Sequence, residues 1–200
     1  SLEWKVYRLN TRGKNIIMIF KKLDIQGVFQ IELEKIEDNR GFFSRSWDKQ
    51  KFEENGINSK LVQCNISFNK KRGTIRGLHF QKKPYEEAKF VRCVKGKVYE
   101  IFVDLRKKSE TFLKWGGIEL DSKKLTCLYV PEGFALGFQT LEDNTELLYQ
   151  MSELYKPESS KGIIWNDKKL GIEWPLTISI ISEKDLCLPN LEQVIKELES

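Results

Sequence analysis

Short runs of apolar and β-branched residues alternate with turn residues along most of the chain. This pattern is typical of β-strands that are joined by tight turns. No strand–helix–strand alternation appears, so we expect an antiparallel sandwich or barrel rather than a parallel α/β fold. The predicted strands cover residues 61–68, 89–94, 98–105, 115–120, 125–130, 147–151 and 178–181.

Two segments carry helical signals instead. Residues 47–55 precede Gly56, a residue type suited to the C-terminal cap of a helix. Residues 191–199 follow Pro189-Asn190 and place their leucines, valine and isoleucine at helical spacing. We therefore expect a few short helices at the periphery of a β-rich fold whose interior can hold a small ligand.

Two further segments are interpreted as architecture. Residues 131–138 carry two closely spaced glycines, which favours a turn at a corner of the barrel. Residues 165–175 begin with Trp-Asn-Asp and end with Trp-Pro. We interpret them as a structured surface loop that covers one end of the barrel.

The composition is that of one folded globular domain. Hydrophobic residues make up 40% of the 200 residues, which is enough to bury a core and too many for a disordered chain. No repeat or linker divides the chain, and the first methionine is Met18. We expect a single domain over residues 18–200, preceded by an N-terminal extension over residues 1–17 that is either native or added to the natural protein.

Charge and hydropathy exclude several classes of partner. The net charge of +5 is mild and suits an anionic ligand such as a diphosphate, while no Lys/Arg block is dense enough to predict nucleic-acid binding. No apolar run approaches the roughly 20 residues of a membrane span, so no membrane is expected as a partner, and no signal-peptide pattern is visible.

The cysteines point to a reducing compartment. They form no CxxC pair and are interpreted as buried free thiols, which predicts neither a disulfide framework nor a zinc site. Such usage is typical of a cytosolic, cytoplasmic protein. The four residues are Cys64, Cys93, Cys127 and Cys187.

The only histidine, His79, is the first candidate for chemistry. A single histidine is more often a satisfied structural group, but an imidazole is also the natural proton acceptor near neutral pH. In a regular strand Arg76 would share a face with Leu78, and His79 with Gln81. Gly77 could instead mark a bulge that re-aims these side chains. A base of this kind needs a carboxylate to fix its tautomer, and the chain offers many.

Two more polar residues lie on apolar strands. Lys89 begins such a strand, where it either extends to water or is buried beside a partner. Tyr149 lies among leucines, where it is either a packing residue with a bonded hydroxyl or a general acid in a pocket. Barrel proteins with catalytic metals rely on two or three histidines, so the single histidine excludes that class of metal site.

Eight motifs resemble, in order, those of the dTDP-4-dehydrorhamnose 3,5-epimerase family, over about residues 18–189. The resemblance implies a cupin-type jelly-roll barrel without a metal or other cofactor, usually a homodimer, that acts as an isomerase on a nucleoside-diphosphate sugar. The motifs are Arg40-Gly41-Phe42-Phe43, Gln63-Cys64-Asn65-Ile66-Ser67, Arg76-Gly77-Leu78-His79-Phe80-Gln81, Lys89-Phe90-Val91-Arg92-Cys93, Val103-Asp104-Leu105-Arg106, Pro131-Glu132-Gly133-Phe134-Ala135, Trp165-Asn166-Asp167 and Ser182-Glu183-Lys184-Asp185.

The resemblance also implies roles for individual residues. His79 would be the base and Asp185 its orienting carboxylate, while Tyr149 would be the general acid on the opposite face. Lys89 would stabilise the enolate that forms at the C4 ketone oxygen. The implied substrate-binding residues are Arg40, Gln63, Asn65, Arg76, Tyr155 and Lys184. Among them, Arg40 would contact the phosphates near a dimer interface, and Tyr155 would stack on the nucleotide base.

Three positions differ from the family's pattern. Leu136 replaces a second histidine and cannot hydrogen-bond a sugar, whereas Arg45 and Ser160 replace glutamates. Because the base and acid positions match the family, the resemblance still implies an epimerase of a 4-keto-6-deoxy sugar nucleotide, acting at C3, C5 or both, for surface polysaccharide such as lipopolysaccharide O-antigen. The alternatives are a degenerate member that binds a nucleotide sugar without converting it, and a ketoisomerase on the same scaffold.

Overall fold

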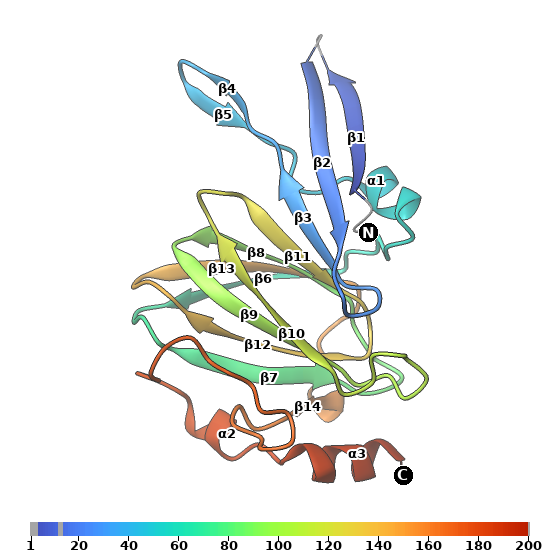
Figure 1. The fold of residues 1–200 in the computed structure, drawn as a ribbon, viewed down its shortest axis with the longest axis vertical. Helices are drawn as coiled ribbons and strands as arrows, with labels where there is room; N and C mark the ends of the chain where they lie inside the picture. The colour runs from blue at the N-terminus through green and yellow to red at the C-terminus, as the bar shows by residue number, and fades with distance from the viewer. Residues whose placement is uncertain (1–3, 12–13, 200) are drawn as a thin grey trace.

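Two antiparallel sheets face each other in the computed structural model, which describes the backbone of residues 4–11 and 14–199 and the side chains of residues 18–198 (Figure 1). The seven-stranded sheet has the order β1 (Trp4–Thr11), β2 (Lys14–Lys22), β3 (Phe29–Leu33), β11 (Thr126–Val130), β8 (Lys89–Lys95), β13 (Thr145–Met151), β6 (Gln63–Asn69). The five-stranded sheet has the order β10 (Trp115–Asp121), β9 (Lys97–Asp104), β12 (Phe134–Thr140), β7 (Ile75–Gln81), β14 (Ser160–Gly162).

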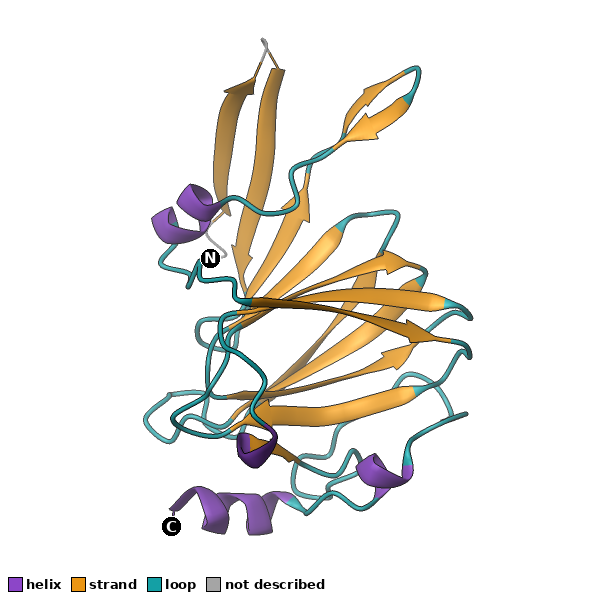
Figure 2. Ribbon diagram, turned by 180° about the vertical axis from the view of Figure 1, so that it is seen from behind, coloured by secondary structure: helices purple, strands orange, loops and turns teal. Residues whose placement is uncertain are grey.

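A separate hairpin and a few short helices complete the fold. The hairpin β4 (Ile36–Asp38) and β5 (Gly41–Phe43) stands away from both sheets (Figure 1). The helices are α1 (Lys49–Glu54), the 3-10 helix η1 (Pro157–Ser159), α2 (Glu183–Leu186) and α3 (Leu191–Glu199). They lie outside the sheets (Figure 2), which confirms the prediction of an all-β jelly roll with short peripheral helices.

The predicted strands and helices are confirmed except for one strand. Residues 178–181 form no strand, and Ile180 makes only an isolated bridge to Thr74. The Ser179 N–H donates to Gly73 O at 3.0 Å and the Ile75 N–H donates to Ile180 O at 2.9 Å. The pairing ends there, because the N–H two residues further along β7, at Gly77, donates to the Asp185 carboxylate instead. The predicted helices over 47–55 and 191–199 appear as α1 and α3, and Gly56 follows α1 at a φ of +69°.

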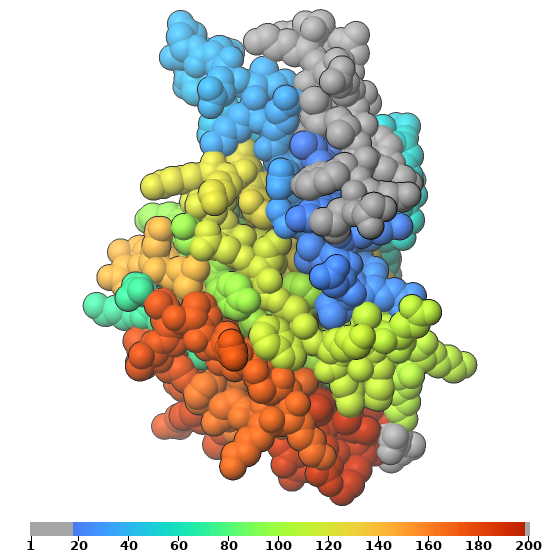
Figure 3. Space-filling model, viewed as in Figure 1, coloured from blue at the N-terminus to red at the C-terminus, as the bar shows by residue number. Residues whose placement is uncertain are grey.

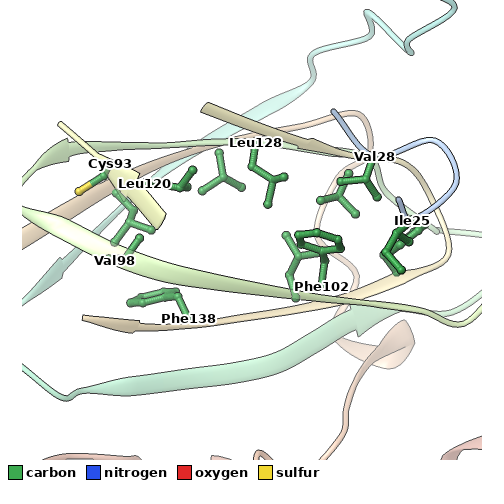
Figure 4. Packing of buried hydrophobic residues seen from close by; sticks show 13 residues of the cluster. Ile25, Val28, Cys93, Val98, Phe102, Leu120, Leu128 and Phe138 are labelled. Carbon is green, nitrogen blue, oxygen red and sulfur yellow. The ribbon is translucent and has the colours of Figure 1, made fainter. Parts of the chain in front are cut away.

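The core between the sheets comes from the inward face of each strand. Val91 and Leu147 of the larger sheet meet Phe102, Leu136 and Phe138 of the smaller one. Figure 4 shows Leu128, Cys93 and their neighbours filling the space between the layers. Because inward positions alternate with outward positions along a strand, any polar residue on an inward position must lie in this core or in a cavity beside it.

Both outer faces of the sandwich are partly covered. Phe52 of α1 packs on Phe90 and Tyr129 at the outer face of the larger sheet. Residues 163–174 and α3 pack against Ile101 and Val103, on the outer face of the smaller sheet. The expectation that residues 165–175 cover one end of a barrel was therefore wrong: they cover a sheet face, because their apolar side chains complete a third hydrophobic cluster.

Two other interpretations need correction. Residues 131–138 are a turn only at their start, and Phe134–Thr140 is the buried strand β12. Gly137 of this strand lies against Gly77. A Cβ added at Gly137 would come within 3.2 Å of the Gly77 Cα. Of the four free cysteines, only Cys93 and Cys127 are buried, because Cys64 and Cys187 point away from the apolar clusters.

The N-terminal strands extend the larger sheet. β2 runs through the predicted boundary at Met18, pairs with β3 and carries β1 on its other side. The division into an extension and a domain at that residue remains a prediction. No helix in the described ranges is long and apolar enough to span a membrane.

Candidate active site

A cavity with two lobes lies between the sheets beside the core. Four residues line both lobes: Asn65, His79, Lys89 and Tyr149. The Tyr155 lobe, of about 250 Å³, is also lined by Phe80, Gln81, Glu87, Met151, Tyr155, Ser160 and Lys184. The Glu100 lobe, of about 270 Å³, is also lined by Ile66, Ser67, Arg76, Glu100, Leu136, Gly137 and Phe138.

A bulge in β7 brings two of the predicted residues to the same lobe. Leu136 of β12 pairs with His79 and Phe138 pairs with Arg76, so three residues of β12 oppose four residues of β7. Gly77 takes a φ of +116°, which favours glycine, and a Cβ there would meet Gly137 Cα at 2.6 Å. The bulge alternative is thus confirmed, and Arg76 and His79 both face the cavity.

The histidine is held by a single buried carboxylate. His79 Nε2 lies 2.7 Å from Asp185 Oδ1, and Asp185 Oδ2 accepts a hydrogen bond from the Gly77 backbone N–H at 3.1 Å. Burial acts to raise the pKa of Asp185, but the hydrogen bonds and charge of His79 and the Gly77 N–H outweigh it and lower that pKa. An ionised Asp185 keeps the proton on Nε2, so Nδ1 is the free nitrogen of a ring that lines the cavity.

Short local elements place Asp185 behind the ring. The Ser182 hydroxyl caps α2 by accepting from the Asp185 N–H at 3.1 Å. This cap fixes the single helical turn that carries the carboxylate. The segment that includes α2 is far from β7 in sequence, and folding brings this carboxylate, which the resemblance implied, to the histidine.

Tyr149 reaches the cavity from the opposite wall. It lies on β13 of the seven-stranded sheet, whereas His79 lies on β7 of the five-stranded sheet. Burial raises the pKa of the Tyr149 phenol well above its ordinary value, and the nearby Glu100 carboxyl, the second largest cause, acts in the same direction. The phenol therefore stays protonated at neutral pH and can donate a proton into the space between the two walls.

Lys89 is buried and paired, as the second of its two interpretations requires. Its Nζ lies 2.6 Å from Glu87 Oε1, and both side chains are about one-tenth exposed. Glu87 in turn accepts from the Gln81 amide at 3.1 Å. The pair offsets the cost of burying the ammonium group and holds a positive charge between the two lobes.

The predicted substrate-binding residues divide into those in the cavity and those outside it. Asn65, Arg76, Tyr155 and Lys184 line it, as noted above. Gln63 lies behind them, where its Oε1 accepts from the Tyr155 N–H at 3.1 Å.

Arg40 does not reach the cavity of its own chain. It lies in the β4–β5 hairpin, its side chain is 85% exposed, and it pairs with Asp38 at 2.6 Å.

Among the departures from the family's pattern, Leu136 and Ser160 line the cavity, one in each lobe. Arg45 does not, because it pairs with Asp48 beside α1.

The sequence analysis missed two acidic residues of the site, Glu87 and Glu100. Glu100 lies between Val98 and Phe102, two inward-facing residues of an apolar strand. The signal that drew attention to Lys89, a charged residue on an apolar strand, applied to Glu100 as well. Within the described side chains, no group of three His, Cys, Asp or Glu is placed to hold a metal ion.

The sequence matches one known family and many of its members. A family profile described as dTDP-4-dehydrorhamnose 3,5-epimerase matches residues 22–193. The dTDP-4-dehydrorhamnose 3,5-epimerase of Salmonella typhimurium strain LT2 is 42% identical over 181 residues, which cover 90% of this chain and 98% of that protein.

Solved structures agree with this similarity. The dTDP-4-dehydrorhamnose 3,5-epimerase of Bacillus anthracis, crystallised with TDP and PPi, is 41% identical with a TM-score of 0.82, over 85% of this chain and 97% of that one. The dTDP-6-deoxy-D-glucose-3,5-epimerase of Legionella pneumophila, in complex with dTDP-4-keto-L-rhamnose, is 34% identical with a TM-score of 0.85, over 90% and 96%. Both comparisons extend over nearly the whole described sandwich.

Proposed function

The chain belongs to the dTDP-4-dehydrorhamnose 3,5-epimerase family, and from this we propose how its cavity acts on a dTDP-linked 4-keto-6-deoxy sugar. The protein is an isomerase that removes a proton from a carbon beside the ketone and returns one to the opposite face. The observation that carries the assignment of residues is the His79–Asp185 pair at 2.7 Å, with Tyr149 on the facing sheet.

His79 takes the proton in this mechanism. The C–H bond breaks, its electron pair moves into the ring to form the enolate, and the proton goes to the free Nδ1. Asp185 stabilises the imidazolium through Nε2–H. The charge that develops on the ketone oxygen is stabilised by the Lys89 ammonium, which is already fixed in place by Glu87.

Tyr149 completes the inversion. Because it projects from the sheet opposite His79, a sugar between them has one face toward the base and the other toward the phenol. The neutral phenol donates its proton to the carbon, and the enolate electrons re-form the ketone. Base and acid on facing walls give net inversion, whereas a single residue acting from one wall would return the proton to its original side.

The nucleotide is assigned to the Tyr155 lobe. The half-exposed Tyr155 ring offers a stacking surface for the base, and Lys184 offers a positive charge for the diphosphate. Arg76 and Asn65 then contact the sugar between the lobes. The four free cysteines suit a reducing, cytosolic compartment. The product would supply deoxysugar for surface polysaccharide.

Deuterium uptake tests these roles. With dTDP-4-keto-L-rhamnose in deuterated water, the parent enzyme should exchange the protons beside the ketone, and His79→Asn should exchange them at least about 100-fold more slowly. Lys124→Ala, an exposed change outside both lobes, is the matched control. Equal exchange by His79→Asn and the parent would refute the assignment of the base.

The same experiment separates the rival activities. A degenerate member would bind the sugar nucleotide without deuterium uptake. A ketoisomerase would give a product whose carbonyl has moved to another carbon, which NMR of the product detects. Inversion at C3, C5 or both is read from the carbons that carry deuterium.

A homodimer is the assembly that we propose. Phe68, 44% exposed, lies on the edge strand β6 and, unlike Ile66 of the same strand, is not among the residues that line the cavity. Phe42 and Phe43 are more than half exposed on the β4–β5 hairpin, which protrudes from the body in Figure 3. Burying such apolar surface against a second copy is favourable, and the hairpin would carry Arg40 to the partner's site.

Light scattering tests the dimer directly. The parent should have twice the mass of one chain, and Phe68→Glu should shift it toward the monomer. Arg40→Ala should then weaken the binding of dTDP without changing the mass. A monomeric parent with full epimerase activity would overturn this assembly.

A further inference from the structure

One buried carboxyl in the cavity has no partner in the structure. Glu100 of β9 is 1% exposed, and neither of its carboxyl oxygens has a hydrogen-bond partner among the described residues. Its neighbours across the sheet are Ile118 and Phe138, which offer no polar side chain. A buried carboxyl without a hydrogen bond destabilises the fold, so its presence requires another explanation.

The other charged groups of the same lobe are already engaged. Lys89 is paired with Glu87 at 2.6 Å, and His79 is bonded to Asp185. Arg76 donates from Nε to Asn69 Oδ1 at 2.7 Å. Among the titratable side chains of this lobe, Glu100 is the one for which the described residues provide no hydrogen bond.

The carboxyl is protonated for much of the neutral range. Burial raises its pKa to about 8, and the Lys89 charge acts in the opposite direction without offsetting it. A neutral carboxyl has an O–H donor and a carbonyl acceptor, and it suits a hydroxyl or carbonyl oxygen. The same wall is otherwise apolar near Glu100, because Leu136 and Phe138 lie there.

We propose that Glu100 is a specificity-determining residue that hydrogen-bonds an oxygen substituent of the sugar in the Glu100 lobe. This inference rests on the proposed function, which places the nucleotide in the Tyr155 lobe and the reacting carbons beside His79, Lys89 and Tyr149. The sugar then extends past these residues toward Glu100. With Leu136 unable to bond the sugar, Glu100 supplies a polar contact beside it on that wall.

Binding measurements with two ligands test the contact. In a His79→Asn background, which prevents conversion, Glu100→Leu should weaken the binding of dTDP-4-keto-L-rhamnose about tenfold. The binding of dTDP alone should stay within about twofold, since it has no sugar to place in the Glu100 lobe. Glu100→Gln keeps one donor and one acceptor of similar shape and should retain most of the affinity for both ligands.

Each other outcome overturns the inference. Unchanged affinity of Glu100→Leu for the sugar nucleotide would show that the carboxyl does not touch the sugar. Equal weakening for both ligands would show a structural role. If Glu100→Gln lost as much affinity for the sugar nucleotide as Glu100→Leu, the ionised carboxylate would be the form that binds. That result would contradict a contact made by a neutral donor.

Failure of this inference and failure of the proposed function give different results. If the parent enzyme took up no deuterium, the epimerase mechanism would fail, while a sugar-specific loss of binding in Glu100→Leu would still support the contact. A folding defect is monitored by thermal unfolding. Glu100→Leu should unfold at a higher temperature than the parent, because it removes a buried group without a partner, and Glu100→Gln provides the second variant.

Discussion

The stability of the protein should depend on pH through Glu100. Its pKa is about 8 in the folded protein against an ordinary value of 4.5, because burial disfavours the carboxylate. Between these two values the folded state holds a proton that the unfolded state has released. Stability is therefore lost as pH rises through this window, and Glu100→Gln should remove that loss.

The magnitude follows from the two pKa values. Each pH unit between them contributes about 1.4 kcal/mol, which gives a gain of about 3.5 kcal/mol for Glu100→Gln over the parent between pH 5 and pH 8. This is an upper value, because Glu100 borders a cavity that water can enter, and water lessens the cost of ionisation. We expect about 2–3.5 kcal/mol.

Urea unfolding at pH 5, 6, 7 and 8 measures this difference. All samples need the same protein concentration, since a dimer couples stability to concentration. The difference between variant and parent isolates the effect of Glu100, because the other polar groups that face it, Lys89, Tyr149, Arg76 and His79, are present in both proteins. The exposed Glu110→Gln controls for the loss of one glutamate. A difference that stays constant from pH 5 to pH 8 would refute the reasoning.

Three further outcomes are expected. Asp185→Asn should lower kcat about 100-fold or more, because a neutral amide cannot stabilise the His79 imidazolium, and deuterium uptake checks this. The fold should be retained, as circular dichroism shows, because the amide oxygen can still accept from the Gly77 N–H. Gly77→Ala should destabilise the protein by about 3 kcal/mol or more, since the added Cβ would meet the Gly137 backbone. Urea unfolding measures this loss against the control Gly171→Ala, whose Cβ meets no atom and which should cost about 1 kcal/mol. Cys127, whose pKa burial raises to about 12, should resist alkylation until urea unfolds the protein, as mass spectrometry detects.

The two sheets have different tasks in the proposed mechanism. The smaller sheet carries the base and Glu100, whereas the larger sheet carries the phenol and Lys89. Because each wall is a rigid strand ladder packed on the shared core, the distance between base and acid is set by the sandwich rather than by loops.

Much of the fold followed from local patterns in the sequence. Alternating apolar strands and recurring turns predict an antiparallel two-layer fold, because each strand must bury one face. The eight motifs indicated the family, which the comparisons confirm, and with it the candidate base His79, whose role stays a prediction. The prediction of a strand at 178–181 was wrong because its pairing with the start of β7 ends after one bridge, where the Gly77 N–H donates to Asp185 instead.

The geometry of the site was decided by tertiary structure. That Arg76 and His79 share a face depends on the bulge at Gly77, which is set by the close approach of Gly137 from another strand. The choice of Asp185 depends on a segment that is distant in sequence. The missing partner of Glu100 is a property of its surroundings. A sequence specifies which groups are present and which way a strand tends to alternate, whereas contacts between distant segments exist only once the sheets have packed.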